Sequence, residues 1–508
     1  MPQYLSPGVY VEEVQTGARP IEGVGTAVAA FVGFAERGPF HEPTRVANWN
    51  QYVREFGGFV EDAYLPHAVY GYFANGGGAA YVVRVGGPAG DADAEPAAAT
   101  PVTLGGLRVS ALPSAGPDIS VEVADADGEN PPDDRFKLLV RQGDKVVETF
   151  DVSTRKNVKN YVVTQVAERS KLIEVAERSA GALARPDKQS VAVPAPKAPK
   201  APKAVTLDAQ EYVGDAAART GFGGLENVDE VTMVAVPDLM SAYQRGLIDL
   251  EGVQTVQAAV ISHCEQMGDR VAVLDAPPGM SAQRVHKWRM EEANHDSRYA
   301  TLYFPWIKVF DPVGGRNTLV PPSGHVAGVW ARSDAERGVH KAPANEVIRG
   351  AVDLELALSK SEQDLLNPVG VNCVRTFPGR GIRIWGARTL SSDPAWRYLN
   401  VRRLFNFLEE SILLGTQWVV FEPNDDRLWA GIRRNITAFL TEQWRQGALF
   451  GRTPDEAFYV KCDRDNNPPE SVDLGQVVCE IGVSPVKPAE FVVFRLSQFS
   501  DNTSLVSE

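Results

Sequence analysis

Cysteine is scarce in this chain, and its spacing excludes two common uses of the residue. Four cysteines occur among 508 residues, Cys264, Cys373, Cys462 and Cys479, and none belongs to a CxxC pair. A disulfide scaffold needs a denser set of cysteines, and a zinc site needs closely spaced ligands. We therefore expect free, buried thiols, no metal ion and no cofactor.

Long apolar runs and large basic blocks are also missing. No stretch of 18 apolar residues occurs, so we expect no membrane insertion. The opening residues, MPQYLSPGVYVEEV, lack a basic start followed by an apolar core, so we expect no signal peptide. The net charge is −14, and the only basic tract is a short lysine–proline spacer, which argues against nucleic acid as a partner.

Catalytic motifs are absent as well. The sequence contains no P-loop, no HExxH and no GxSxG. Asp275, Ser281 and His325 supply the residue types of a subtilisin-like triad, but no segment typical of the protease histidine precedes Ser281. His325 and His340 are interpreted as structural, and Ser323 as the cap of a helix over 325–334. An α/β serine hydrolase with a non-standard triad stays the alternative function.

Apolar strands that alternate with helices dominate the first and middle parts of the chain. A continuous apolar run at 26–34 and largely apolar segments at 79–85, 231–236, 270–275 and 302–310 predict buried strands. Helices are predicted at 48–56, 64–74, 249–267, 281–295 and 343–358. Gly76-Gly77-Gly78 follows a helix and precedes a strand, so it is interpreted as a helix terminator. The pattern predicts an α/β core with a mostly parallel sheet.

Two low-complexity stretches, 86–101 and 191–204, enclose a different pattern. The second repeats Ala-Pro-Lys and predicts an extended spacer. Residues 102–190 between them show strand-like alternation and an amphipathic helix over about 160–182. Linkers at both ends indicate an inserted α+β outer module.

From residue 372 the pattern becomes α+β. Strands are predicted at 381–387, 417–421, 457–462, 475–483 and 490–499, and helices at 394–414 and 427–446. The predicted parts are an N-terminal arm (1–25), the α/β core (26–86 and 205–371), the inserted module with its linkers (87–204), the C-terminal α+β domain (372–489) and a C-terminal arm (490–508).

The N-terminal segment is β-prone and too short to be stable alone, so it needs a sheet edge, and the C-terminal segment is predicted to be a long final strand. The N-terminal one either pairs within its own domain or is donated to another subunit. The arm residues are Val9, Tyr10, Val11, Glu12, Glu13 and Val14 at one end, and Phe491, Val492, Val493, Phe494, Arg495 and Leu496 at the other.

Long ordered motifs resemble the contractile tail sheath family of phages and phage-tail-like injection systems. They are SPGVYVEEV, YFANGGGAAYVVRV, PPSGHVAGVWARSDAERGVHKAPAN, LNPVGVN, GRGIRIWGARTL, WRYLNVRRLF, VVFEPND and PVKPAEFVVFRLSQ. The similarity covers most of the chain outside 87–204. It implies a subtilisin-like core without protease activity.

The same resemblance implies an assembly. Subunits would stack as hexameric rings around an inner tube, with a baseplate and a terminator as further partners, and the arms would complete a sheet shared between neighbours. Contraction would need no nucleotide. Assembly would take place in the bacterial cytoplasm, and lysis would release the particle.

The resemblance also suggests roles for two further groups of residues. The helix at 427–446 has an apolar stripe of Leu428, Ile432, Ile436, Phe439 and Leu440. Its arginines, Arg427, Arg433, Arg434 and Arg445, are the candidate contact with the inner tube, and a solvated or internally paired face is the alternative. Gly17, Gly23 and Gly25 are the candidate hinges of the N-terminal arm.

Overall fold

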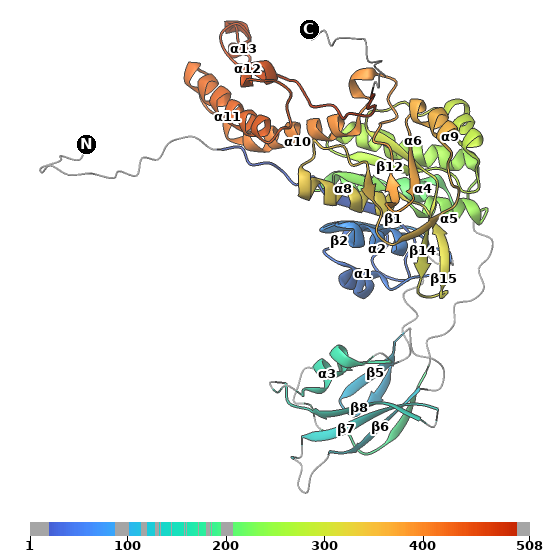
Figure 1. Cartoon of the computed structure of the whole chain (residues 1–508). Helices are drawn as coiled ribbons and strands as arrows, with labels where there is room; N and C mark the ends of the chain where they lie inside the picture. Colours follow the sequence, from blue (N-terminus) through green and yellow to red (C-terminus); the bar gives the residue numbers. More distant parts are fainter. Residues whose placement is uncertain are drawn as a thin grey trace, which may run out of the picture. The chain divides into compact units, whose positions relative to one another are not determined.

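The chain divides into two compact units in the computed structural model, residues 1–88 with 205–508 and residues 89–204 (Figure 1). The structure describes 20–86, 101–112, 119–126, 132, 134–143, 145–156, 158, 160–170, 172–178, 183, 185–194 and 207–494. The arm residues Val9–Val14, with Gly17, and the pair Arg495 and Leu496 lie outside these ranges.

A nine-stranded sheet forms the centre of the larger unit. Its strands, in spatial order, are β16 (Glu346–Val347), β19 (Gly381–Ile384), β18 (Val371–Phe377), β13 (Ala300–Phe304), β12 (Val271–Asp275), β11 (Met233–Ala235), β1 (Val28–Gly33), β3 (Ala79–Arg84) and β2 (Thr44–Val46). The strands from β18 to β3 run parallel, and β2, β19 and β16 pair antiparallel at the edges. The predicted α/β class with a largely parallel sheet is confirmed.

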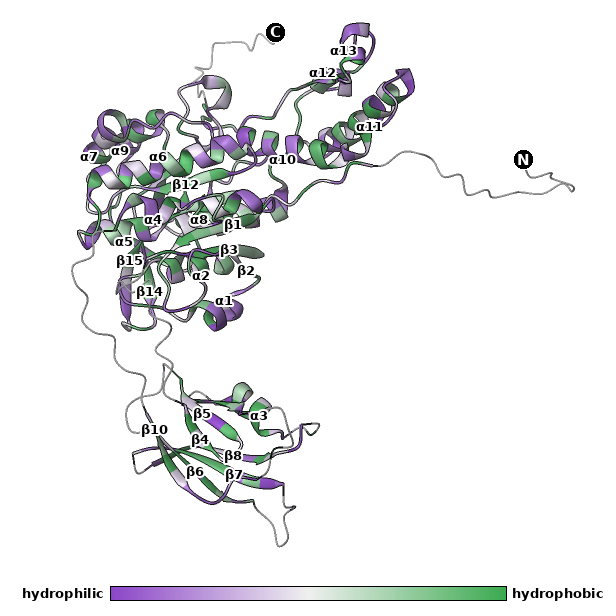
Figure 2. Ribbon diagram, turned by 180° about the vertical axis from the view of Figure 1, so that it is seen from behind, coloured by the Kyte–Doolittle hydropathy of each residue, from purple (hydrophilic) through white to green (hydrophobic). Residues whose placement is uncertain are grey.

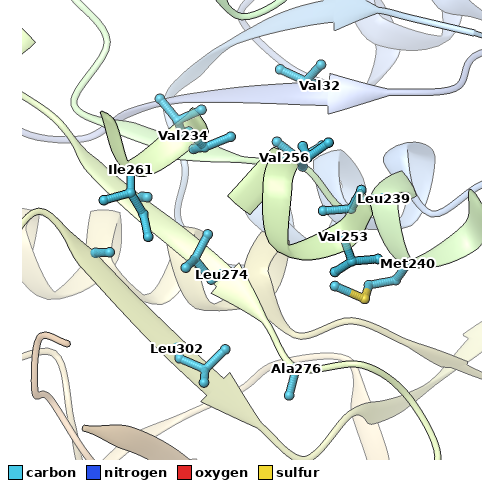
Figure 3. Packing of buried hydrophobic residues seen from close by; sticks show 14 of the residues in the cluster. Val32, Val234, Leu239, Met240, Val253, Val256, Ile261, Leu274, Ala276 and Leu302 are labelled. Atoms are coloured by element: carbon cyan, nitrogen blue, oxygen red, sulfur yellow. The ribbon is translucent and has the colours of Figure 1, made fainter. Parts of the chain in front are cut away.

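Helices cover both faces of this sheet, as the apolar strands require. One face packs against α4 (Ala209–Val213), α5 (Asp238–Gln244), α6 (Leu250–Met267) and α7 (Ala282–Lys287). Figure 3 shows Val253, Val256 and Ile261 of α6 beside strand residues of this cluster. The other face packs against α1 (Trp49–Phe56), α2 (Leu65–Asn75) and α8 (Ser323–Arg337). Figure 2 shows hydrophobic residues along the central strands.

Two predictions in the core were wrong. The strand expected at 302–310 is split into β13 and β14 (Ile307–Asp311), and β14 joins β15 (Arg316–Val320) and β17 (Ala351–Leu354) in a separate antiparallel sheet. The helix expected at 343–358 instead contains β16 and β17. Gly350 lies between them at φ +86°, outside the helical region, and the β-branched residues around it favour strands.

The smaller unit is mostly β. One sheet contains β4 (Val102–Leu104), β5 (Leu107–Ala111) and β9 (Ile173–Glu177), and the other contains β10 (Ser190–Val193), β6 (Ile119–Asp125), β7 (Arg135–Gln142) and β8 (Lys145–Ser153). The predicted helix was too long. The helix α3 spans Val162–Arg169, and the alternating segment IEVAE that follows forms β9, which pairs with β5. The predicted spacer began too early, because β10 pairs with β6.

The two residues of the larger unit that flank the insertion, Gly86 and Leu207, lie close together. Gly86 has φ +49°, and a Cβ placed on it would lie 3.3 Å from Cδ1 of Leu207. The backbone N–H of Leu207 donates to the Leu247 carbonyl, which attaches the returning chain to the core.

The C-terminal part is built on α10 (Leu399–Gly415) and α11 (Asp426–Arg445), followed by α12 (Pro454–Ala457), β20 (Phe458–Lys461), α13 (Pro469–Asp473) and β21 (Glu480–Val483) (Figure 1). Its expected start at residue 372 is too early, because β18 and β19 belong to the core sheet. Where a strand was expected at 417–421, Gln417–Val419 form a 3₁₀ turn. Residues 490–494 lie outside any strand. Among the described helices, none has the length and apolarity needed to cross a membrane.

Candidate assembly surfaces

The histidine- and glycine-rich segment that contains α8 is part of the core. Residues Ser323 to Ser333 are all buried. The backbone N–H of Ser323 donates to Oδ1 of Asp275 at 2.9 Å, at the end of β12. Ser323 is the first residue of the helix and its side chain does not cap it, which corrects the predicted cap; Pro322 occupies the cap position.

The three candidate triad residues do not converge. His325 packs against α2, where a Cβ on Gly71 would lie 2.3 Å from its Cε1, and its Nδ1 is buried without a hydrogen-bond partner among the described residues. Burial and the nearby His67 lower the pKa of His325 to about 3. The Ser281 side chain accepts the Arg284 N–H and caps α7. The site lacks the oriented histidine that a serine hydrolase requires.

Close approach of α2 and α8 explains two glycines of this segment. A Cβ on Gly324 would lie 2.3 Å from Cα of Ala68, and one on Gly328 would lie 2.4 Å from the Tyr72 carbonyl oxygen. No real Cβ tolerates such distances, so larger residues at either position would force the helices apart. The unusual residues of the segment therefore serve helix packing.

Replacing Asp275 by asparagine is expected to reduce the loss of stability at high pH. Burial raises the pKa of Asp275 from 3.8 to about 7. Between these values the folded chain keeps a proton that the unfolded chain has lost, so this stabilising contribution is complete below about pH 4 and is lost as the pH rises towards 7. From pH 5 to pH 8 the wild type should lose about 2–3 kcal/mol more than D275N. Urea unfolding at both pH values measures the difference, and equal losses would contradict the prediction.

A buried ion pair joins α8 to α10 and to the root of the N-terminal arm. Arg403 donates through Nη1 and Nη2 to the two carboxylate oxygens of Asp334, at 2.9 and 2.6 Å. Thr26 donates its hydroxyl to the same carboxylate at 2.7 Å, and its carbonyl accepts from Arg403 at 3.0 Å. The guanidinium also lies 4.8 Å from the ring centroid of Trp330. Both charged side chains are at most 5% exposed.

The root of the N-terminal arm is fixed to α10 before it reaches this ion pair. Ile21 is buried, and a Cβ on Gly415 would lie 2.7 Å from its side chain. The backbone N–H of Val24 donates to Oγ of Ser411 at 3.1 Å. A Cβ on Gly23 would lie 2.8 Å from the Phe407 ring, so this glycine allows close packing.

These contacts argue against a hinge at Gly23. Gly25 has open space around its Cα, yet it lies between the fixed residues Val24 and Thr26. Neither glycine is therefore a free joint in the described structure.

The C-terminal arm is also anchored at its root. Glu490 forms a bidentate pair with Arg388, with contacts of 2.8 and 2.6 Å, and accepts from Asn367 at 2.9 Å. Burial would raise the pKa of Glu490, but the hydrogen bonds from Arg388 and Asn367 outweigh it and lower the pKa. The next four residues, Phe491, Val492, Val493 and Phe494, are 68–84% exposed. Sequence patterns could not reveal this anchor, because its partners are about 100 residues apart.

Three of the four candidate arginines on α11 share one exposed face. Asp425 caps the helix by accepting the N–H groups of Arg427 and Leu428, and the predicted apolar stripe is buried. Arg427, Arg434 and Arg445 are exposed and are separated by about two and three helical turns. Arg433 instead donates to the carbonyl of Cys462, so it holds β20.

Comparison with known proteins finds tail sheath proteins. Two family models match adjoining parts of the chain, "phage tail sheath protein central domain" at 226–390 and "phage tail sheath C-terminal domain" at 391–499, together more than half of it. The tail sheath protein of Burkholderia phage BcepMu is 24% identical over 96% of this chain and 95% of that protein. The tail sheath protein of Vibrio phage KVP40 is 27% identical, over 47% of this chain, and the match spans 39% of that longer protein.

Solved structures of sheath proteins share the fold. The sheath of an extracellular contractile injection system, PVC, in the contracted state has a TM-score of 0.60 at 23% identity, covering 98% of this chain and 99% of that one. The helical sheath of the anti-feeding prophage in the contracted state has a TM-score of 0.59 at 24% identity, covering 97% and 99%.

Proposed function

Because the chain belongs to the phage tail sheath family, we propose that it is the structural subunit of a contractile sheath that surrounds an inner tube and drives it through a target envelope. The observation that carries the proposal is the family match over the core and the C-terminal part. A second observation supports it: the apolar segment Phe491–Phe494, which follows the anchored residue Glu490, is exposed and pairs with no strand in the described structure. The family relatives are structural proteins, and the failed triad agrees with a core that is subtilisin-like in fold only.

Assembly in this proposal proceeds through shared sheets. Subunits stack as hexameric rings, and the arms pair with neighbouring copies, since an exposed apolar segment gains stability by joining a sheet edge. The acceptor is β20 with β21, which pair only with each other in the described structure. Two strands alone are marginally stable, so added strands would benefit both partners. The other partners are the inner tube, a baseplate and a terminator, and assembly takes place in the cytoplasm before the particle is released.

Contraction in this proposal moves each subunit body as a rigid piece. The buried Arg403–Asp334 pair ties α10 to the core, and the cluster that contains Leu404, Ile432 and Phe439 ties α10 to α11. The extended sheath is a kinetically trapped state, and contraction buries additional apolar surface at about 25 cal/mol per Å². The joints that allow the bodies to move lie in the arms, outside the anchored residues Ile21 and Glu490.

Electron microscopy of the purified protein tests the proposed function. Tubes or stacked rings are the expected result. A discrete monomer whose serine reacts with a fluorophosphonate probe would overturn it in favour of the α/β hydrolase.

Charge reversal on α11 is expected to weaken binding to the inner tube. The exposed face with Arg427, Arg434 and Arg445 would attract an acidic tube surface, and replacing two of these cations by glutamate would make the same contact repulsive. The R427E/R434E variant should co-sediment with purified tubes about tenfold less than wild type or worse.

The matched control changes the same number of charges elsewhere. Arg54 and Lys287 are exposed on α1 and α7, at 73% and 61% of their side-chain area. The R54E/K287E variant should bind tubes like wild type. Wild-type binding by R427E/R434E would show that the α11 face is merely solvated.

A further inference from the structure

Cys462 and Cys479 are neighbours across the β20–β21 hairpin. The strands are antiparallel with Phe458 opposite Val483 and Lys461 opposite Glu480. One step beyond this register places Cys462 directly opposite Cys479. Because the segment 463–478 separates the two cysteines, no local sequence pattern predicts that they are opposite each other.

The type of cross-strand pair favours a covalent link. The backbone N–H of Ser484 donates to the carbonyl of Ala457 at 2.8 Å, and these residues are opposite each other, so they form a hydrogen-bonded pair. Hydrogen-bonded and non-hydrogen-bonded pairs alternate along an antiparallel ladder, which makes 462 and 479 a non-hydrogen-bonded pair. In such pairs the Cα atoms are about 4.5 Å apart, inside the range of about 4.4–6.8 Å that a disulfide needs.

Side chains around the hairpin hold both backbones in place. The Asn467 side chain accepts the Val478 N–H at 2.6 Å and donates to the Val478 carbonyl at 2.9 Å, next to Cys479. Arg433 of α11 donates to the Cys462 carbonyl. Cys462 is buried, Cys479 is half-buried, and both are free thiols. Burial and the adjacent Cys462 raise the pKa of Cys479 to about 12, and burial also raises the pKa of Cys462. Both thiols are therefore protonated at neutral pH and react slowly there.

We propose that Cys462 and Cys479 are a modification site at which a small-molecule disulfide forms a cross-strand disulfide. The half-buried Cys479 thiolate attacks the reagent and releases one thiol, which leaves a mixed disulfide. The Cys462 thiolate then attacks the Cys479 sulfur and releases the second thiol. Two protein thiols are oxidised, one small disulfide is reduced to two thiols, and the new bond closes the loop 463–478.

The link would lock the hairpin that accepts neighbouring arms, a role that rests on the proposed function. Formation of the bond itself needs no assembly, because both cysteines belong to one hairpin. A chain kept unassembled therefore tests the disulfide separately from sheath formation.

Incubation of the unassembled full-length protein with oxidised glutathione at pH 8.5, followed by alkylation and peptide mass spectrometry, tests the proposal. The expected result is a linked pair of peptides that contain Cys462 and Cys479, with a monomer on a non-reducing gel. Cys264 and Cys373, both buried, should stay alkylatable only after denaturation and serve as internal references.

The C479S variant is the matched control and should show no linked peptide. In the wild type the linked form should appear about tenfold faster per pH unit between pH 7 and 9, since the thiolate fraction rises by that factor. Full alkylation of both cysteines, glutathione on one of them only, or covalent dimers would each overturn the proposal.

Discussion

Replacing Asp334 by alanine is expected to lower the free energy of unfolding of the larger unit by about 3–5 kcal/mol, because it leaves the buried Arg403 charge without a partner. The same change removes the acceptor of the Thr26 hydroxyl, at the root of the N-terminal arm. Urea unfolding followed by tryptophan fluorescence measures the effect. All nine tryptophans lie outside 89–204, so the signal reports on the larger unit alone.

Two controls separate this effect from a general loss of charge. Glu291→Ala removes one partner of the exposed pair Lys287–Glu291 and should leave the unfolding curve unchanged. The double variant D334L/R403M removes both charges and should recover much of the loss, because no buried charge is left unpaired. If D334A unfolds like the wild type, the pair does not hold α10 to the core.

Removal of residues 491–508 is expected to abolish tube formation and leave the subunit folded. The side chains of Phe491–Phe494 are exposed, so their loss costs the isolated chain almost no buried surface. A neighbouring subunit would lose a strand that completes its sheet. Electron microscopy and sedimentation measure assembly, and the melting temperature measures folding.

Deletions of other lengths make this test specific. Removal of residues 500–508, the polar tail, should leave tubes intact, whereas removal of residues 1–15 should abolish them. Normal polymerisation after either arm deletion would show that the corresponding arm does not link subunits.

Sequence patterns predicted the elements with strong periodicity. The apolar runs of β1 and β12 and the amphipathic helices α6 and α11 were predicted within a few residues. Each has a pattern that only one environment satisfies, either burial on both faces or one apolar stripe. The exposed arginine face of α11 followed from the same periodicity.

Long-range packing explains what the sequence could not predict. Residues 343–358 have enough apolar residues for a helix, but pairing of β16 with β19 and of β17 with β14 made them strands. The segment QWVVF has strand propensity, yet no sheet edge receives it in the described structure, and Gln417–Val419 form a turn. Arg403 and Asp334 are 69 residues apart, and Arg388 and Glu490 are 102 apart, so no local pattern links them.

Because Gly86 lies close to Leu207, we expect that the insertion between them can be replaced in evolution and in engineering. The larger unit should then tolerate loss or exchange of the 120 residues between Gly86 and Leu207 without a change in its core. The inserted unit has its own apolar cluster, which includes Val121, Leu138 and Val152, as a domain that folds by itself requires. If another domain replaced the inserted unit, a polymer of such subunits would carry one copy of that domain on every subunit, at regular intervals.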